Sequence, residues 1–305
     1  MVRRRPLPLE LSKQPFSMAE ADELGVPRSR LRARDLATPH RGVRAPLDQP
    51  TDIPGRCHAY APLLHDGQFF SHVSAAALHG LPVPTWEHEA PLDVASIAPA
   101  RAPRGSGVRG HQLDGDHWEV VAVEGLPVLT AVDAWCQLGT RLPLDDLVIA
   151  GDVLLRRRRP LASEQQIVRG LARMNGRRGA KRLRLAFSMM RPRTDSPMET
   201  ALRLLIVRAG LPEPLVNEVI SDAPGRFLAL GDLVYPEQRV LVEYDGGTHF
   251  SDERQIFHDI DRLDRVMAAG WRVIRVNRSH LTDPSPILTA LARELSLPAS
   301  RGAPD

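Results

Sequence analysis

The sequence predicts an α/β chain, α+β overall, and three observations support this fold class. The 305 residues are 43% hydrophobic and 25% charged, near the globular average, and the chain is long enough for two or three domains. Helical apolar periodicity and strand-like alternation both occur, but in different segments. Twenty-seven prolines and 22 glycines separate these segments. We expect domains at 1–50, 51–192 and 193–298, followed by a disordered tail at 299–305.

The composition excludes several classes of protein. Cys57 and Cys136 are too few for a disulfide framework or a four-cysteine zinc site. No stretch approaches the roughly 20 apolar residues of a membrane-spanning helix, and the basic start MVRRRPLPLE has no apolar segment behind it. We expect a soluble, cytoplasmic protein with no membrane partner.

Lys13 and Lys181 are the only lysines, so the basic residues are almost all arginines, which favour bidentate phosphate contacts. GC-rich coding would give the same bias.

The first 50 residues have the pattern of a DNA-binding unit. Ser17 and Glu20 form a capping box, Phe16 lies where a hydrophobic staple is expected, and Gly25 ends this short helix. A second helix is expected to start at Pro27, and ATPHRGVRAP resembles a β-hairpin wing. These features predict a winged helix-turn-helix, and the alternative is a helical hairpin with a solvated basic face. The expected DNA contacts on the second helix are Arg28, Arg30, Arg32 and Arg34.

Residues 51–192 predict a mixed α/β region and then basic helices. LDVASIAP and HWEVVAVEGLPVLT alternate as strands, and Thr130 caps the helix TAVDAWCQLG. From 143 to 190 three helices form the most basic stretch of the chain, either to follow a phosphate backbone or as a solvated face. Seven histidines lack metal-ligand spacing, so we expect surface or core side chains rather than a metal site. They are His58, His65, His72, His79, His88, His111 and His117.

The last third of the chain predicts the element order α-β-β-β-α-β-α. Ser196 begins a helix that ends at Gly210, VNEVI is a strand, and FLALGDLVYP with RVLVEYDG forms a hairpin. RQIFHDIDRLDRVMAAG is an amphipathic helix, WRVIRVN a buried strand and PILTALAREL a final helix. The predicted inward side chains of the amphipathic helix are Ile256, Ile260, Leu263 and Met267.

The hairpin brings acidic residues together. Asp232 and Glu243 lie on opposite strands, and Asp245 shares a strand face with Glu243, so three carboxylates are expected to converge. Carboxylates this close raise one another's pKa unless a cation neutralises them, and hard oxygen ligands select Mg²⁺ or Mn²⁺. The sequence therefore predicts a divalent metal held by Asp232 and Glu243.

The segments SPMETALRLLIVRAGL, GDLVYPEQRVLVEYDGGTHF and HDIDRLDRVMAAGWRVIRV resemble the PD-(D/E)xK nuclease superfamily. More closely, they resemble a bacterial domain family related to very-short-patch repair endonucleases. The resemblance implies a restriction-endonuclease-like α-β-β-β-α-β core acting as a hydrolase on DNA. It also implies that Asp232 and Glu243 hold the metal, that Glu199 reaches it directly or through water, and that His249 transfers a proton near the scissile phosphate.

One position departs from the superfamily pattern. Asp245 stands where a lysine is expected, so either His249 substitutes for it or catalysis is weak or absent. Arg262 is another candidate for the positive charge. Each residue also has an ordinary structural interpretation: Glu199 completes a capping box, and Asp245 ends a strand in an Asp-Gly turn. In the same way, Arg262 forms an ion pair with Asp259, and His249 is a loop histidine.

The first part of the chain resembles the winged-helix antitoxin of type IV abortive-infection systems. FSMAEADELGVPRSRLRARDLATPHRGVRAP and SHVSAAALHGLPVP carry this resemblance, which implies binding to double-stranded DNA and a cognate toxin as partner. Two functions follow from the sequence. One is an Mg²⁺-dependent DNA endonuclease in DNA repair or phage defence. The other is a non-catalytic DNA-binding regulator or antitoxin with a degenerate nuclease-like domain.

Overall fold

The computed structural model describes residues 6–115, 117–222, 224–246 and 253–296, and the side chains of 253–258 are outside this description. The fold is mixed α and β, in agreement with the predicted class. The chain forms two compact units that exchange segments. Unit 1 contains Met1–Leu142 and Gln165–Leu183, and unit 2 contains Pro143–Glu164 and Arg184–Asp305. The expected tail at 299–305 lies outside the described residues.

Unit 1 begins with a small sheet around a short helix. The strands β1 (Phe16–Ser17), β2 (Leu36–Ala37) and β3 (Val43–Pro46) form an antiparallel sheet in the order β1-β3-β2. The helix α1 (Met18–Glu23) starts at the predicted capping box, in which the Ser17 hydroxyl accepts a hydrogen bond from the Glu20 backbone N–H. A 3₁₀ turn, η1 (Leu9–Leu11), precedes it.

The expected second helix from Pro27 is not formed as an α-helix. This segment contains a single 3₁₀ turn, η2 (Arg30–Arg32), and its N-cap Ser29 makes no side-chain capping hydrogen bond. Arg30 bonds both carboxylate oxygens of Asp35 at 2.9 and 3.0 Å, and Leu36 already belongs to strand β2. A helix continuing to Leu36 is incompatible with that strand, so the basic segment is shorter and less regular than predicted.

The larger part of unit 1 is a five-stranded sheet in the order β6-β5-β4-β8-β7. Its strands are β4 (Gln68–Phe70), β5 (Leu92–Ile97), β6 (Val108–Leu113), β7 (Val120–Val123) and β8 (Leu126–Leu129). The pairs β5–β6 and β4–β8 are parallel, and the pairs β4–β5 and β7–β8 are antiparallel.

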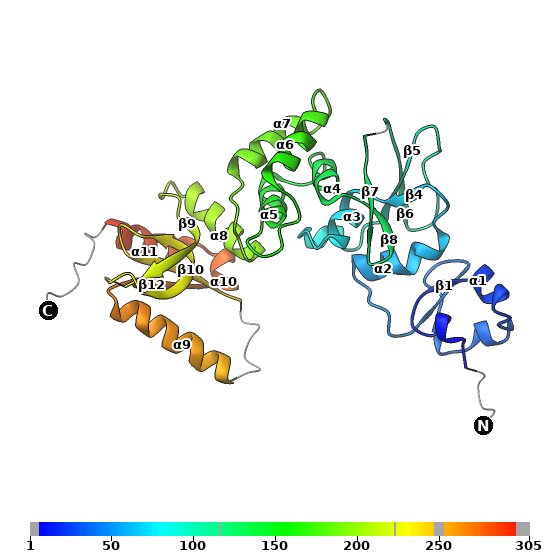
Figure 1. The fold of residues 1–305 in the computed structure, drawn as a ribbon, viewed down its shortest axis with the longest axis horizontal. Coiled ribbons are helices and arrows are strands. Elements are labelled where there is room, and N and C mark those ends of the chain that lie inside the picture. The colour runs from blue at the N-terminus through cyan, green and yellow to red at the C-terminus, as the bar shows by residue number, and fades with distance from the viewer. Residues whose placement is uncertain (1–5, 116, 223, 247–252, 297–305) are drawn as a thin grey trace. The chain divides into compact units, whose positions relative to one another are not determined.

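Helices and short turns connect and cover this sheet, as the cyan and green parts of Figure 1 show. Helix α4 starts at Thr130, whose hydroxyl accepts from the Asp133 N–H, so the predicted cap is confirmed. The helices are α2 (Ile53–Tyr60), α3 (His72–Leu78), α4 (Ala131–Leu138) and α6 (Glu164–Arg173), with 3₁₀ turns η3 (Ala61–Leu63) and η4 (Thr85–Glu87). The boundary between the units passes through α7 (Ala180–Met189).

Unit 2 contains a four-stranded sheet in the order β12-β11-β10-β9. Its strands are β9 (Leu215–Ser221), β10 (Phe227–Tyr235), β11 (Val240–Asp245) and β12 (Arg272–Asn277). The first three are antiparallel neighbours, and β12 runs parallel to β11. The helices are α5 (Leu144–Leu154), α8 (Pro197–Arg208), α9 (Glu253–Ala268), α10 (Arg278–Thr282) and α11 (Ser285–Ser296).

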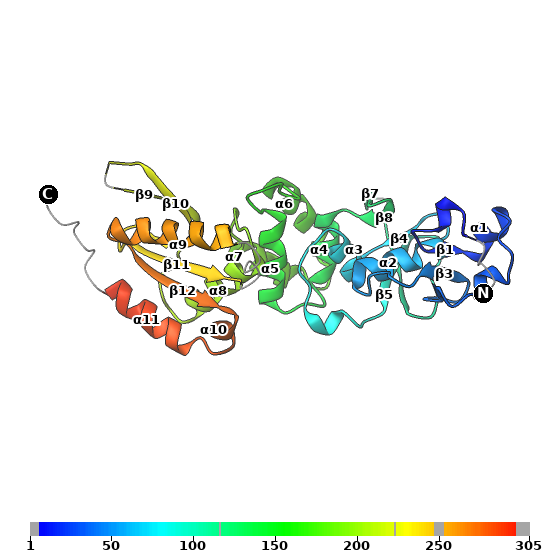
Figure 2. The same ribbon diagram turned by 90° about the horizontal axis from the view of Figure 1, so that it is seen from below.

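Both faces of this sheet are covered. One face packs against α8 and α11 through a core that includes Leu202, Val242 and Leu291. The other packs against α9 through Leu241 and Val266. Figures 1 and 2 show α9 on one side of the sheet and α11 on the other. A strand with helices on both faces is apolar at successive positions, which explains why β11 is buried throughout Val240–Glu243.

The face of α9 that meets the sheet differs from the predicted one. Ile260 and Met267 are each 48% exposed, whereas Val266 is fully buried and Leu263 packs beside it. The prediction was wrong at Ile260 and Met267, and Ile256 lies outside the described side chains. The helix is turned so that Arg262 reaches Glu243 on β11, and this ion pair together with Val266 sets its rotation.

A buried ion pair joins α5 to α8 within unit 2. Arg203 and Asp152 are 1% and 0% exposed, and Arg203 Nη2 lies 2.8 Å from Asp152 Oδ2. The Thr200 hydroxyl and the Arg191 backbone N–H also donate to the Asp152 carboxylate, at 2.9 and 2.7 Å. These hydrogen bonds satisfy a charge that would otherwise be costly to bury.

None of the helices in the described ranges is both long and apolar enough to span a membrane.

Candidate active site

The candidate site lies where β10 and β11 run side by side in unit 2. The register pairs Leu233 with Val242, and its continuation by one residue places Asp232 opposite Glu243. Val242 packs in the core shared with α8 and α11 and Leu241 in the core against α9, so Glu243 lies on the face that α9 covers. The Asp232 carboxyl is close enough to Glu243 for that carboxylate to raise its pKa. The two carboxylates therefore lie near each other, directly beyond the last printed pair of the hairpin, as the sequence predicted.

Asp232 lies in an environment that disfavours its charged form. Burial, followed by the Glu243 and Glu199 carboxylates, raises the pKa of this carboxyl to about 8. The Tyr244 backbone N–H donates to Asp232 Oδ2 at 2.8 Å, which acts in the opposite direction by stabilising the anion. In the metal-free protein, Asp232 is therefore protonated at neutral pH.

Glu243 has a cationic partner. It is 8% exposed, and Arg262 on α9 donates to both of its carboxylate oxygens, at 3.2 and 3.0 Å. This contact raises the pKa of the Arg262 guanidinium. Arg262 Nε also lies 3.8 Å from Asp259 Oδ1. This is the local ion pair that the sequence suggested as an alternative. The predicted positive charge near the acids is thus present, and it comes from α9.

Glu199 approaches Asp232 from α8. It is 5% exposed, and burial raises its pKa. Its Oε2 accepts from the Asn217 side chain at 2.7 Å and from the Asp195 N–H at 3.0 Å. Asn217 on β9 has a φ of 46°, in the left-handed region, so the strand alternation is interrupted there. Ser196 caps α8 as predicted, but the Glu199 carboxylate bonds Asp195 and Asn217 instead of closing the box.

Asp245 does not join Asp232 and Glu243. It ends β11, is half-buried, and accepts from Arg275 on β12 at 2.6 Å. The carboxylates that raise the Asp232 pKa are those of Glu243 and Glu199. The parallel strand β12 pairs Arg275 with Glu243, two residues before Asp245, and the Arg275 side chain reaches forward to the Asp245 carboxylate. His249, the predicted proton-transfer residue, lies outside the described residues.

The four arginines predicted to contact DNA are not equivalent. The Arg30 side chain is 9% exposed and pairs with Asp35, so it is part of the fold of unit 1. Arg28, Arg32 and Arg34 are exposed around the 3₁₀ turn. Three of the four predicted residues are therefore at the surface.

The structure also joins three residues that the sequence did not connect. Ligand atoms of His72, Asp93 and His111 all lie within 4.8 Å of one another, so this group could hold a metal ion. His72 is the first residue of α3, and parallel pairing of β5 with β6 brings His111 beside Asp93. The imidazole rings stack with centroids 3.9 Å apart, and His111 Nε2 is 2.8 Å from Asp93 Oδ1.

One contact limits this group as a metal centre, whereas the state of His72 suits a ligand. Arg141 donates to both oxygens of Asp93, at 3.0 and 2.8 Å, and occupies the carboxylate. Burial and the neighbouring His111 lower the pKa of His72 to about 3, so its imidazole is neutral as a ligand must be. Imidazole donors suit zinc or another transition metal better than Mg²⁺. No local spacing in the sequence indicates this group, because its members come from three separate elements.

Comparisons with known proteins identify relatives but not a function. No family model matches the chain. It is 27% identical over 192 residues to the uncharacterized proteins MT2308 and Rv2248 of two Mycobacterium tuberculosis strains, over 62% of this chain and 68% of each relative. The crystal structure of the RV2827C protein from M. tuberculosis is 16% identical, over 70% of this chain and 84% of that one. Its TM-score is 0.37, too low to define a shared fold.

Proposed function

We propose that the protein is a divalent-metal-dependent DNA endonuclease that hydrolyses phosphodiester bonds. One observation carries this proposal: Asp232 and Glu243 lie opposite each other in adjacent strands, and the pKa of Asp232 is raised to about 8. Strongly perturbed carboxyls with a specific charged neighbour are typical of functional sites. A bound cation would relieve the repulsion that raises this pKa.

The donor set fits a hard divalent metal. Asp232 and Glu243 would hold Mg²⁺ or Mn²⁺, which would supply a Lewis acid for the phosphate and lower the pKa of an attacking water. Arg262 and such a metal compete for the Glu243 oxygens. A guanidinium displaced from Glu243 would remain close by on α9, where it suits a bidentate contact with a phosphate. Glu199 lies near enough to raise the Asp232 pKa, and Asn217 fixes its orientation.

We further propose that the α8-β9-β10-β11-α9-β12 succession is a restriction-endonuclease-like core and that the first 50 residues form a winged-helix DNA-binding unit. The element order and the antiparallel β9–β10–β11 arrangement support the first part. The β1-β3-β2 sheet beside α1, with exposed Arg28, Arg32 and Arg34, supports the second. Double-stranded DNA is the proposed partner.

A second function is favoured by two other observations. Asp245 stands where the lysine is expected. Arg262 donates to both oxygens of Glu243, so the charge of this buried carboxylate is compensated without a metal. These features suit a regulator or antitoxin that binds DNA and has a cognate toxin as partner, because such a protein needs neither a catalytic lysine nor a metal. Its nuclease-like domain would serve binding alone.

Cleavage assays separate the two functions. Supercoiled plasmid and a duplex with a T:G mismatch are incubated with the purified chain and Mg²⁺, Mn²⁺ or EDTA. Asp232→Asn and Glu243→Gln are the test variants, and Asp264→Asn at an exposed position of α9 is the matched control. We expect metal-dependent cleavage that both test variants abolish and the control retains. Retained duplex binding without cleavage in any metal would instead establish the regulator.

A further inference from the structure

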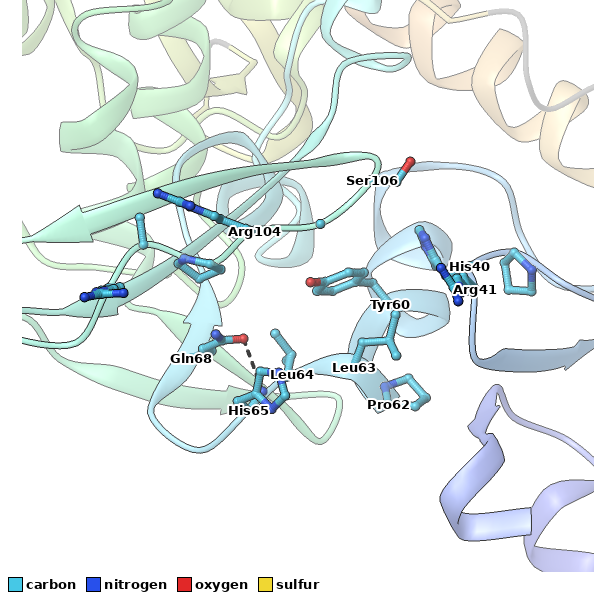
Figure 3. Close-up of a pocket in the computed structure, with 15 residues that line it drawn as sticks. His40, Arg41, Tyr60, Pro62, Leu63, Leu64, His65, Gln68, Arg104 and Ser106 are labelled. Carbon is cyan, nitrogen blue, oxygen red and sulfur yellow. Dashed lines mark hydrogen bonds between the residues drawn. The ribbon is translucent and has the colours of Figure 1, made fainter. Parts of the chain in front are cut away.

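A large cavity in unit 1 shares no residue with the candidate active site. It has a volume of about 950 Å³ and is formed by three segments: the turn between β2 and β3, the end of α2 with η3, and the loop 101–106 that follows β5. Its size is within the range of small-ligand pockets, roughly 300–1,000 Å³. Figure 3 shows Tyr60 in the middle, with Arg104 on one side and His40 and Arg41 on the other.

The lining of this cavity is strongly cationic. Arg41, Arg101 and Arg104 contribute three positive charges, and none of the 15 lining residues is acidic. All three side chains are exposed. Across the described part of the chain, no ion pair or side-chain hydrogen bond engages them, whereas Arg30, Arg141 and Arg203 each hold a carboxylate. Three arginines gathered without a counter-ion favour an anionic ligand.

Neutral and apolar groups lie beside these charges. The Tyr60 and His40 rings meet edge to face with centroids 5.3 Å apart, and Leu63 and Pro62 line the same wall. Burial and the nearby Arg56 lower the pKa of His40, so its imidazole is neutral and can either donate or accept a hydrogen bond. The cavity thus offers an apolar, partly aromatic wall next to guanidinium groups.

We propose that this cavity binds a nucleotide, either free or as one unit of a single-stranded nucleic acid. The guanidinium fork matches phosphate oxygens bidentately, and the partly exposed Pro62 and Leu63 beside His40 suit a nucleobase. A free phosphate would leave most of the 950 Å³ unfilled. This ligand goes beyond the proposed nuclease function, because the cavity belongs entirely to unit 1 and the carboxylates to unit 2.

Binding is measured by calorimetry on the full chain in EDTA, so that no metal-dependent reaction contributes. The probes are deoxyadenosine monophosphate, inorganic phosphate and a short single-stranded DNA. The test variant is Arg41→Gln with Arg104→Gln, and the matched control is Arg178→Gln, which removes an exposed arginine of unit 1 outside the cavity. Thermal melting of each variant checks the fold, which we expect to be unchanged because the substituted side chains are exposed.

We expect saturable binding of the mononucleotide or the oligonucleotide, weakened at least about tenfold in the double variant and unchanged in the control. Binding of the mononucleotide would identify a free nucleotide as ligand, and binding of the oligonucleotide alone would identify a nucleic acid strand. The proposal is overturned if no nucleotide probe binds, if inorganic phosphate binds as tightly as the nucleotides, or if the double variant binds like the parent. Because EDTA removes the metal and Asp232 is untouched, failure here is distinct from failure of the cleavage assay.

Discussion

Replacing Asp232 by Asn tests the electrostatics of the candidate site in the metal-free protein. The pKa of Asp232 rises from 3.8 to about 8 on folding, so the folded chain binds this proton more tightly than the unfolded chain. The resulting stabilisation is complete below pH 3.8 and is lost as the pH rises to about 8. Each tenfold change in proton affinity is worth about 1.4 kcal/mol, so the shift from 3.8 to about 8 changes the free energy of unfolding by on the order of 5 kcal/mol.

The observed effect will be smaller, because Glu243 and Arg262 respond to the same change in charge. We expect the parent to lose about 2 kcal/mol or more relative to Asp232→Asn between pH 5 and pH 8. That difference corresponds to about 5 °C in melting temperature for a unit of this size. Calorimetric melting of both proteins in EDTA at each pH measures it, with Asp264→Asn as the exposed control. Equal pH dependence in the parent and Asp232→Asn would refute the raised pKa.

Three further predictions concern the fold that supports the site. Arg203→Met leaves the Asp152 carboxylate buried without its cation and should cost about 3–5 kcal/mol in urea unfolding, and a loss below about 1 kcal/mol would contradict a buried ion pair. Ser17→Ala should lower the free energy of unfolding by about 1 kcal/mol because the α1 cap is lost, and Ser17→Thr should lower it much less. Equal stability of the parent and Ser17→Ala would show that the cap contributes nothing. Gly231→Ala would place Cβ 2.5 Å from Leu241 Cδ1, so we expect about 1–3 kcal/mol of destabilisation, and unchanged thermal stability would show that the strands can separate there.

The hairpin and its two acids were predictable from the sequence because strand alternation has a fixed period of two. Asp232 and Glu243 needed only the correct register, and the turn between Tyr235 and Val240 supplies it. The capping boxes and caps at Ser17 and Thr130 are similarly local, since each depends on residues within one helical turn.

What the sequence did not predict depends on partners far away in the chain. Arg275 draws Asp245 to β12, and Arg262 turns the buried face of α9 away from Ile260. The second basic helix failed because the Arg30–Asp35 pair and strand β2 compete with helical continuation. The juxtaposition of His72 and His111 likewise depends on how β5 and β6 pair, which no local spacing encodes.

The exchange of segments between the units has a practical consequence for dissecting the protein. The chain passes from one unit to the other after Leu142, Glu164 and Leu183, so a single cut cannot release either unit free of the other's segments. A fragment starting at 193 would contain the sheet and both carboxylates but would lack α5. Its Arg203 would then be buried without Asp152, and the fragment would be destabilised before its activity could be judged. Deletion variants should therefore begin at Pro143, retaining α5, or Asp232 and Glu243 should be tested by substitution in the whole chain.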